Sequence, residues 1–131
     1  MNNQNNASSG YAAAVKPTRT DRGMEYKIFA RVTHRMKSVD ETDRASFPEL
    51  AKAVAENSRL WAALAEDLMS EENKLSDEMK GQLISLAMFV ARHTHAVLSG
   101  RESVEPLIDI NTSIMRGLRG NGGSKSVEAA A

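Results

Sequence analysis

The three histidines are the side chains best suited to metal binding or acid–base chemistry, because imidazole titrates near neutral pH. His93 and His95 are two residues apart in a segment of helical periodicity, so their side chains point in nearly opposite directions. They cannot bind one metal ion from that helix, and His34 belongs to a different predicted helix. We therefore expect no metal site, and we interpret the histidines as polar residues beside a core.

Other residues with chemical potential also have structural explanations. Acidic neighbours occur at Asp40 and Glu41, at Glu71 and Glu72, and at Asp77 and Glu78. These positions are predicted loops or helix starts, where negative charge favours the helix dipole. The sequence has no cysteine, no serine or threonine in a nucleophile motif and no glycine-rich phosphate loop. We expect a protein that is not an enzyme and has no cofactor.

Asn57 and Trp61 are more informative, because both fall on the apolar stripe of a predicted helix. A buried asparagine must form hydrogen bonds or it destabilises the fold. One interpretation is a core tryptophan with Asn57 fixing the helix register. The alternative is that Leu60 and Trp61 line a groove that receives a partner helix, a mode in which aromatic anchors dominate binding energy.

Amphipathic helices must position these side chains. Apolar residues recur every fourth position at Met24, Ile28, Val32 and Met36, which predicts a helix that starts after Thr20 or Asp21, with Phe29 widening its face. Ser46, Phe47, Pro48 and Glu49 have the spacing of a capping box. The second helix should therefore follow Ser46 and run to about Met69. Its inward stripe is Leu50, Val54, Asn57, Trp61, Leu64 and Leu68.

The third predicted helix is capped by Ser76 and is apolar on two faces. One stripe is Met79, Leu83, Leu86, Val90 and Val97, and the other is Ile84, Met88, Ala91 and Leu98. A helix with apolar residues around so much of its circumference is expected at the centre of the fold. Gly100 should end this helix, and Ser103 should start a fourth with Pro106 in its first turn. The fourth helix would bury Leu107, Ile110, Ile114 and Leu118 and end at Gly120.

The 131 residues, 41% of them hydrophobic, suit one all-α domain, a compact bundle of about four main amphipathic helices. We place this domain at residues 11–120, between a disordered extension at 1–10 and a flexible tail at 121–131. The longest apolar stretch is far shorter than the roughly 20 residues that cross a membrane. The first residues lack the pattern of a secretory signal, so we expect a cytoplasmic protein without membrane insertion.

Charge is distributed unevenly although the net charge is zero. From Lys16 to Lys37 there are seven basic residues against two acidic ones, and from Ser38 to Glu78 eleven acidic against four basic. One interpretation is two solvated faces that attract each other within the fold. The other is a basic strip that binds RNA or an acidic partner. The candidate RNA-binding residues of this strip are Arg19, Arg22, Lys27, Arg31 and Arg35.

Several blocks of the sequence resemble the flagellar biosynthesis regulator FlaF family. The similar blocks are residues 18–20 with 25–33, then 47–51 with 57–67, and finally 86–89 with His93, Val97, Leu98, Gly100 and 107–120. They occur in order and cover the whole predicted domain. Two departures are an asparagine-rich start that is longer than expected and an extension after Gly120.

The resemblance implies a role in flagellin secretion and expression, alongside a translational repressor of flagellin mRNA. It implies no catalytic residues. The leading hypothesis is an export chaperone that holds the helical terminal segments of flagellin in an apolar groove lined by Tyr26 and Trp61. The candidate partner-binding residues are Tyr26, Phe29, Asn57, Arg59, Leu60, Trp61, Asn111, Met115 and Arg116.

The rival hypothesis is post-transcriptional regulation of flagellin synthesis, through RNA or through a translational regulator protein. Readers of single-stranded RNA usually offer exposed stacking aromatics, and this sequence is only 5% aromatic. We therefore do not expect direct RNA binding.

Overall fold

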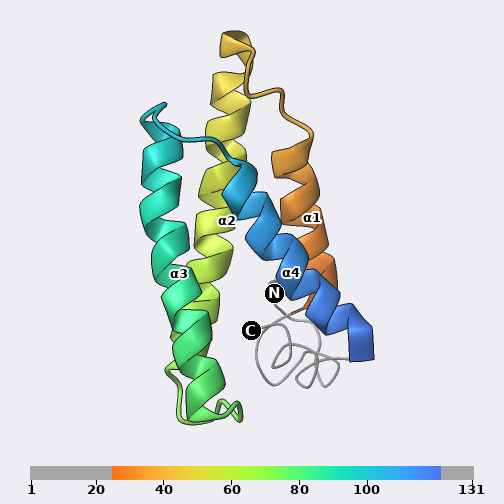
Figure 1. Ribbon diagram of the computed structural model, residues 1–131, viewed down its shortest axis with the longest axis vertical. Coiled ribbons are helices and arrows are strands. Elements are labelled where there is room, and N and C mark those ends of the chain that lie inside the picture. The colour runs from red at the N-terminus through yellow and green to blue at the C-terminus, as the bar shows by residue number, and fades with distance from the viewer. Residues whose placement is uncertain (1–24, 122–131) are drawn as a thin grey trace, which may run out of the picture.

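The computed structural model describes residues 25–121, which form an up-and-down bundle of α-helices (Figure 1). The elements are α1 (Tyr26–Lys37), the 3-10 turn η1 (Arg44–Ser46), α2 (Phe47–Leu68), α3 (Asp77–Leu98) and α4 (Glu105–Asn121). The largest interfaces join α2 with α3 and α1 with α4, and α1 also packs on α2. No strand occurs within this range. The predicted all-α bundle of four main helices is confirmed.

The structure describes the predicted domain only from residue 25, because residues 11–24 lie outside the described range. Asn121, the first residue of the predicted tail, is the last residue of α4. The predicted extension at residues 1–10, the rest of the tail and the predicted first turn around Met24 lie outside the described residues. Among the described helices, none is long and apolar enough to cross a membrane.

α1 buries a slightly different face from the predicted one. The helix begins after Glu25, and its buried residues are Phe29, Val32, Thr33 and Met36. Ile28, which was predicted to face the core, is only half-buried. The buried face is turned toward Phe29 and Thr33 because the Phe29 ring packs edge-on against Trp61, with centroids 5.8 Å apart, and Thr33 accepts a buried hydrogen bond.

The start of α2 does not form the predicted capping box. Ser46 precedes the helix with φ −89° and ψ 0°, and its side chain caps no backbone N–H. The reason is that η1 leads directly into α2, and Asp43 caps this turn by accepting a hydrogen bond from Ala45 N at 3.0 Å. Ser46 N then donates to the Asp43 carbonyl at 2.9 Å. Pro48 lies in the first turn of α2, as predicted.

The connection between α1 and α2 also anchors the start of α4. The Glu41 carboxylate accepts hydrogen bonds from Ser103 Oγ at 2.7 Å and from Val104 N at 3.0 Å. Negative charge is favourable at this helix N-terminus. His93 on α3 contacts the Ser103 carbonyl through Nε2 at 2.8 Å, so three segments meet where α4 begins.

Asp40, in the connection between α1 and α2, forms hydrogen bonds with the nearby residue Thr42. Its carboxylate accepts hydrogen bonds from the Thr42 hydroxyl at 2.6 Å and from the Thr42 amide at 3.0 Å. These hydrogen bonds favour the charged form and lower the pKa of Asp40 below its ordinary value.

α3 lies at the edge of the bundle, so its predicted central position is wrong. It packs mainly on α2, and in Figure 1 the α3 and α4 ribbons spread apart toward the bottom of the view. Its first stripe is buried at Met79, Leu83, Val90 and Val97. No helix of the described range covers the second stripe: Met88 is 56% exposed and Leu98 is 39% exposed. The sequence pattern records apolar character but not whether a neighbour covers it.

The ends of α3 follow their predicted signals. Ser76 Oγ accepts a hydrogen bond from Met79 N at 3.1 Å. At the other end, Gly100 has a φ of 77°, a conformation that glycine adopts without strain. Gly100 N donates to the Val97 carbonyl and Arg101 N to the Ala96 carbonyl, which is the Schellman arrangement.

Candidate functional site

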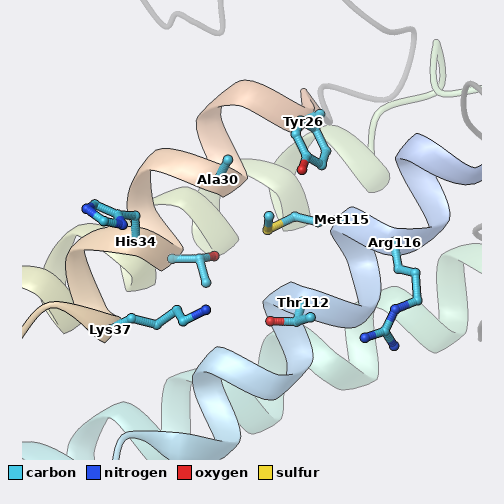
Figure 2. A pocket seen from close by; sticks show the side chains of 8 residues that line it. Tyr26, Ala30, His34, Lys37, Thr112, Met115 and Arg116 are labelled. Atoms are coloured by element: carbon cyan, nitrogen blue, oxygen red, sulfur yellow. The ribbon is translucent and has the colours of Figure 1, made fainter.

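Two cavities lie on different helix pairs of the bundle. The first, here called the α1–α4 cleft, has a volume of about 270 Å³. It is lined by Tyr26, Ala30, Thr33, His34 and Lys37 from α1 and by Thr112, Met115 and Arg116 from α4 (Figure 2). The α1 residues share one face because their spacing is close to multiples of a helical turn. The cleft is therefore a mixed polar and apolar surface along the length of α1.

The second cavity, here called the α2–α3 groove, has a volume of about 310 Å³. It is lined by Ser58, Trp61, Ala62, Ala65 and Met69 from α2 and by Ile84, Ala87, Met88, Val90 and Ala91 from α3. None of these side chains is charged, and Ser58 is the one with a hydroxyl group. The groove follows the C-terminal half of α2 and the middle of α3.

Small residues shape this groove. Ala62 and Ala65 on α2 face Ala87 and Ala91 on α3, and short side chains leave a channel where longer ones would fill the space between the helices. Met69 and Met88 stand at the edges of the groove and are 69% and 56% exposed. Unbranched methionine side chains adapt to the shape of an apolar partner.

A buried chain of hydrogen bonds runs through the bundle between the two cavities. Trp61 Nε1 donates to Asn111 Oδ1 at 2.9 Å, and Asn111 Nδ2 donates to Thr33 Oγ1 at 3.0 Å. Asn111 Nδ2 also donates to Asn57 Oδ1 at 2.8 Å. Thr33 lines the α1–α4 cleft and Trp61 lines the α2–α3 groove. The polar chain therefore fixes the relative positions of α1, α2 and α4 at the level of both cavities.

The predicted partner-binding residues divide into three groups. Tyr26, Met115 and Arg116 come together in the α1–α4 cleft. Phe29, Asn57, Trp61 and Asn111 are buried, and Leu60 is half-buried against the core. Arg59 is exposed on α2 and lines neither cavity. The buried residues lie inside the bundle, where Asn111 is hydrogen-bonded to Trp61 and to Asn57. The role of these residues in partner binding stays a prediction.

Tyr26 and Trp61 do not share one groove, contrary to the expectation from sequence. Tyr26 lines the α1–α4 cleft, whereas Trp61 lines the α2–α3 groove. The difference arises because the two residues belong to opposite helix pairs. Helical periodicity identifies the face of each helix but not the neighbour that the face meets.

The predicted basic strip is partly neutralised within the fold. Glu56 on α2 forms ion pairs with Arg35 at 3.1 Å and with Arg31 at 3.9 Å. Because both arginines are largely exposed, these pairs contribute little to stability, but they place an acidic residue inside the strip. Lys27 is exposed, and Arg19 and Arg22 lie outside the described residues.

The histidines contact neighbouring groups individually. The His93 ring stacks on Phe89, with centroids 5.2 Å apart, while His34 and His95 are exposed. Within residues 25–121, no cluster of three His, Asp or Glu side chains is placed to hold a metal ion.

Several cavity residues were missed by sequence reasoning. Met69 was read as the end of a helix, and Met88 as part of the core. The second apolar stripe of α3 could have indicated the groove, because two apolar stripes form more apolar surface than one neighbouring helix can cover. The sequence did not indicate that Lys37 and Thr112 line a cavity, because they come close together only through the way α4 crosses α1.

A family model described as flagellar protein FlaF matches residues 7–118 of the 131-residue chain. Comparisons with curated proteins and with solved structures find no match. The matched span includes α1, α2, α3 and most of α4, and it contains every residue that lines the two cavities. The chain belongs to the FlaF family of flagellar proteins.

Proposed function

We propose that this protein is a flagellin export chaperone, which binds a helical terminal segment of flagellin in the α2–α3 groove. It has no catalytic role in this proposal and works in the cytoplasm before secretion. Holding the segment keeps its apolar surface from premature assembly and supports flagellin production as a consequence.

The observation that carries the proposal is the apolar channel between α2 and α3, which no other helix of residues 25–121 covers. Its walls carry no charged side chain, and the two exposed methionines, Met69 and Met88, extend the apolar surface outward. Exposed apolar patches of this kind mark interaction surfaces in proteins. Family membership supplies the flagellar context, and flagellin is the flagellar client for which the sequence resemblance argues.

An amphipathic helix is the form of client that this channel suits. The groove lies between two antiparallel helices (Figure 1), and the small alanine side chains in its lining allow a third helix to approach closely. A client segment that is disordered alone pays an ordering entropy on binding, so most of the favourable free energy must come from apolar burial. The absence of charge from the groove lining agrees with that requirement.

The RNA-based alternative receives less support. Direct RNA binding would use the basic strip, but Arg31 and Arg35 share Glu56 as an ion-pair partner. A carboxylate placed among the cations repels phosphate. Regulation through a translational regulator protein is compatible with the chaperone proposal. One protein could hold flagellin for secretion and also act with the regulator of flagellin synthesis.

Co-purification from motile cells tests the proposal. The tagged protein should recover flagellin, and the variant with Met69→Lys and Met88→Lys should not, because lysine places a charge at each edge of the apolar channel. Ser85→Lys is the matched control, since Ser85 is exposed on α3 and does not line the groove. Recovery of RNA without flagellin, or equal recovery of flagellin by all three proteins, would contradict the proposal.

A further inference from the structure

The α1–α4 cleft carries positive charge that no residue of the described range 25–121 neutralises. Lys37 and Arg116 line it from opposite helices, and its lining contains no Asp or Glu. Neither cation forms an ion pair with any residue in the described range, whereas Arg31 and Arg35 of the neighbouring α1 face both pair with Glu56. Within the described residues, Arg31 and Arg35 are therefore paired with a carboxylate, whereas Lys37 and Arg116 are not.

The lining beside these cations contains the hydroxyl groups of Tyr26, Thr33 and Thr112. The Thr112 hydroxyl donates to the Ile108 carbonyl at 2.8 Å and Thr33 is buried, so Tyr26 presents the exposed hydroxyl group. Figure 2 shows the Lys37 amine pointing across the cleft toward Thr112, which lies between Lys37 and Arg116 in this view. Thr33 is buried at the base, where Asn111 donates a hydrogen bond to its oxygen and holds it in place. The base of the cleft is thus positioned by the buried hydrogen-bond chain.

Of the remaining lining residues, His34 is polar, whereas Ala30 and Met115 are apolar and indicate which group accompanies the anion in a ligand. Ala30 and Met115 lie on the Tyr26 side of the cleft in Figure 2, and Tyr26 is 36% exposed. A ligand that fills the cleft therefore presents an anionic group next to an apolar one. A carboxylate side chain in a polypeptide, beside an aliphatic residue, has this combination.

We propose that the α1–α4 cleft binds an acidic peptide segment, with Lys37 and Arg116 pairing with its carboxylates and Tyr26 and Met115 packing on its apolar residues. Nucleic acid fits less well, because phosphate recognition uses a row of cations along the surface and the adjacent arginines are occupied by Glu56. This site is separate from the α2–α3 groove and does not depend on flagellin as the client of that groove.

Methionine methyl groups provide a test that assigns binding to one cavity. In the full chain labelled with ¹³C-methyl methionine, Met115 reports the cleft, Met69 and Met88 report the groove, and Met36 and Met79 report the core. The probe is a short acetylated and amidated peptide of alanine, leucine and glutamate. The control peptide replaces each glutamate with glutamine.

The glutamate peptide should shift the Met115 signal saturably and leave Met69 and Met88 unchanged, and the glutamine peptide should bind more weakly. Lys37→Gln and Arg116→Gln should each raise Kd by up to about fivefold, the range for an exposed charge pair. Lys52→Gln, which removes an exposed lysine of α2 outside both cavities, should leave Kd unchanged.

Three outcomes would overturn the proposal. The first is equal binding of the two peptides, and the second is equal weakening by Lys37→Gln and Lys52→Gln, which would reduce the effect to net charge. The third is an oligouridylate RNA that shifts Met115 and that the glutamate peptide cannot displace. None of these results bears on flagellin capture by the groove, so the two proposals can fail separately.

Discussion

Trp61 on α2 donates its indole N–H to the side-chain carbonyl of Asn111 on α4 across 2.9 Å, and both residues are buried in the bundle. Asn111 returns its own amide hydrogens to Thr33 on α1 and Asn57 on α2. One amide group therefore connects three helices, and an apolar core surrounds it. This arrangement specifies helix register, because a shifted α4 would leave buried polar groups without partners.

Asn111→Ala should lower the free energy of unfolding by about 2–4 kcal/mol, because it leaves the Trp61 N–H and the Asn57 carbonyl oxygen unpaired and opens a small cavity. Urea denaturation measures the loss. Ser113→Ala, an exposed change two residues away on the same helix, should stay within about 0.5 kcal/mol of the wild type. Similar values for the two variants would show that the polar chain does not stabilise the bundle.

Trp61→Ala should cost about 3–5 kcal/mol, since the indole is only 1% exposed and packs on Phe29. Trp61→Phe keeps most of the apolar volume but removes the hydrogen-bond donor, and it should cost about 1–3 kcal/mol. In a double-mutant cycle with Asn111→Ala, the effects should be less than additive, because both changes remove the same hydrogen bond. Full additivity would contradict the coupling of the two residues.

Two glycines should respond to alanine with opposite signs. Gly81 lies inside α3, is exposed, and an added Cβ would meet nothing within 4 Å, so Gly81→Ala should stabilise the fold by about 0.5–1 kcal/mol. Gly100 has a φ of 77°, so Gly100→Ala should destabilise it by about 1 kcal/mol. Thermal unfolding of both variants compares the signs directly, and a destabilised Gly81→Ala variant would contradict the geometry of α3.

Glu41→Gln should weaken the attachment of α4 to the α1–α2 connection by about 0.3–1 kcal/mol, because the negative charge at the helix N-terminus is lost. High salt should reduce the difference from wild type, since Glu41 is exposed. Glu72→Gln in the α2–α3 connection is the matched control and should have little effect. A loss that is independent of salt would mean that hydrogen-bond geometry, and not charge, provides the stabilisation.

The sequence predicted the helices well because their signals are local. The inward stripe of α2, the Ser76 cap and the Gly100 stop each depend on residues within a few positions of one another. The Ser46 capping box was wrong for the same reason, since Asp43 supplied a competing local cap that creates η1. Local signals can conflict, and the structure shows which one prevails.

The cavities were harder to predict because they depend on neighbours distant in sequence. The exposed stripe of α3 has the same residue types as a buried one, and only the oblique path of α4 leaves it uncovered (Figure 1). Similarly, Tyr26 and Arg116 were identified as candidates without any indication that they line one cleft with Lys37. Residue type indicated which side chains could line a cavity, whereas the way the helices cross determines which of them lie together.

We propose that flagellin binds by burying apolar helix surface in the α2–α3 groove. Titration of the purified protein with each terminal segment of flagellin, at low and at physiological salt, measures this binding. One segment should bind with an affinity that changes little with salt, because apolar burial is not screened.

In the same titration, the Met69→Lys, Met88→Lys variant should lose this binding while its cooperative unfolding transition persists. Arg31→Ala with Arg35→Ala should retain it, because these residues lie outside the groove. If binding instead disappeared with the arginine pair and with modest added salt, and survived both lysine substitutions, the groove would not be the flagellin-binding site.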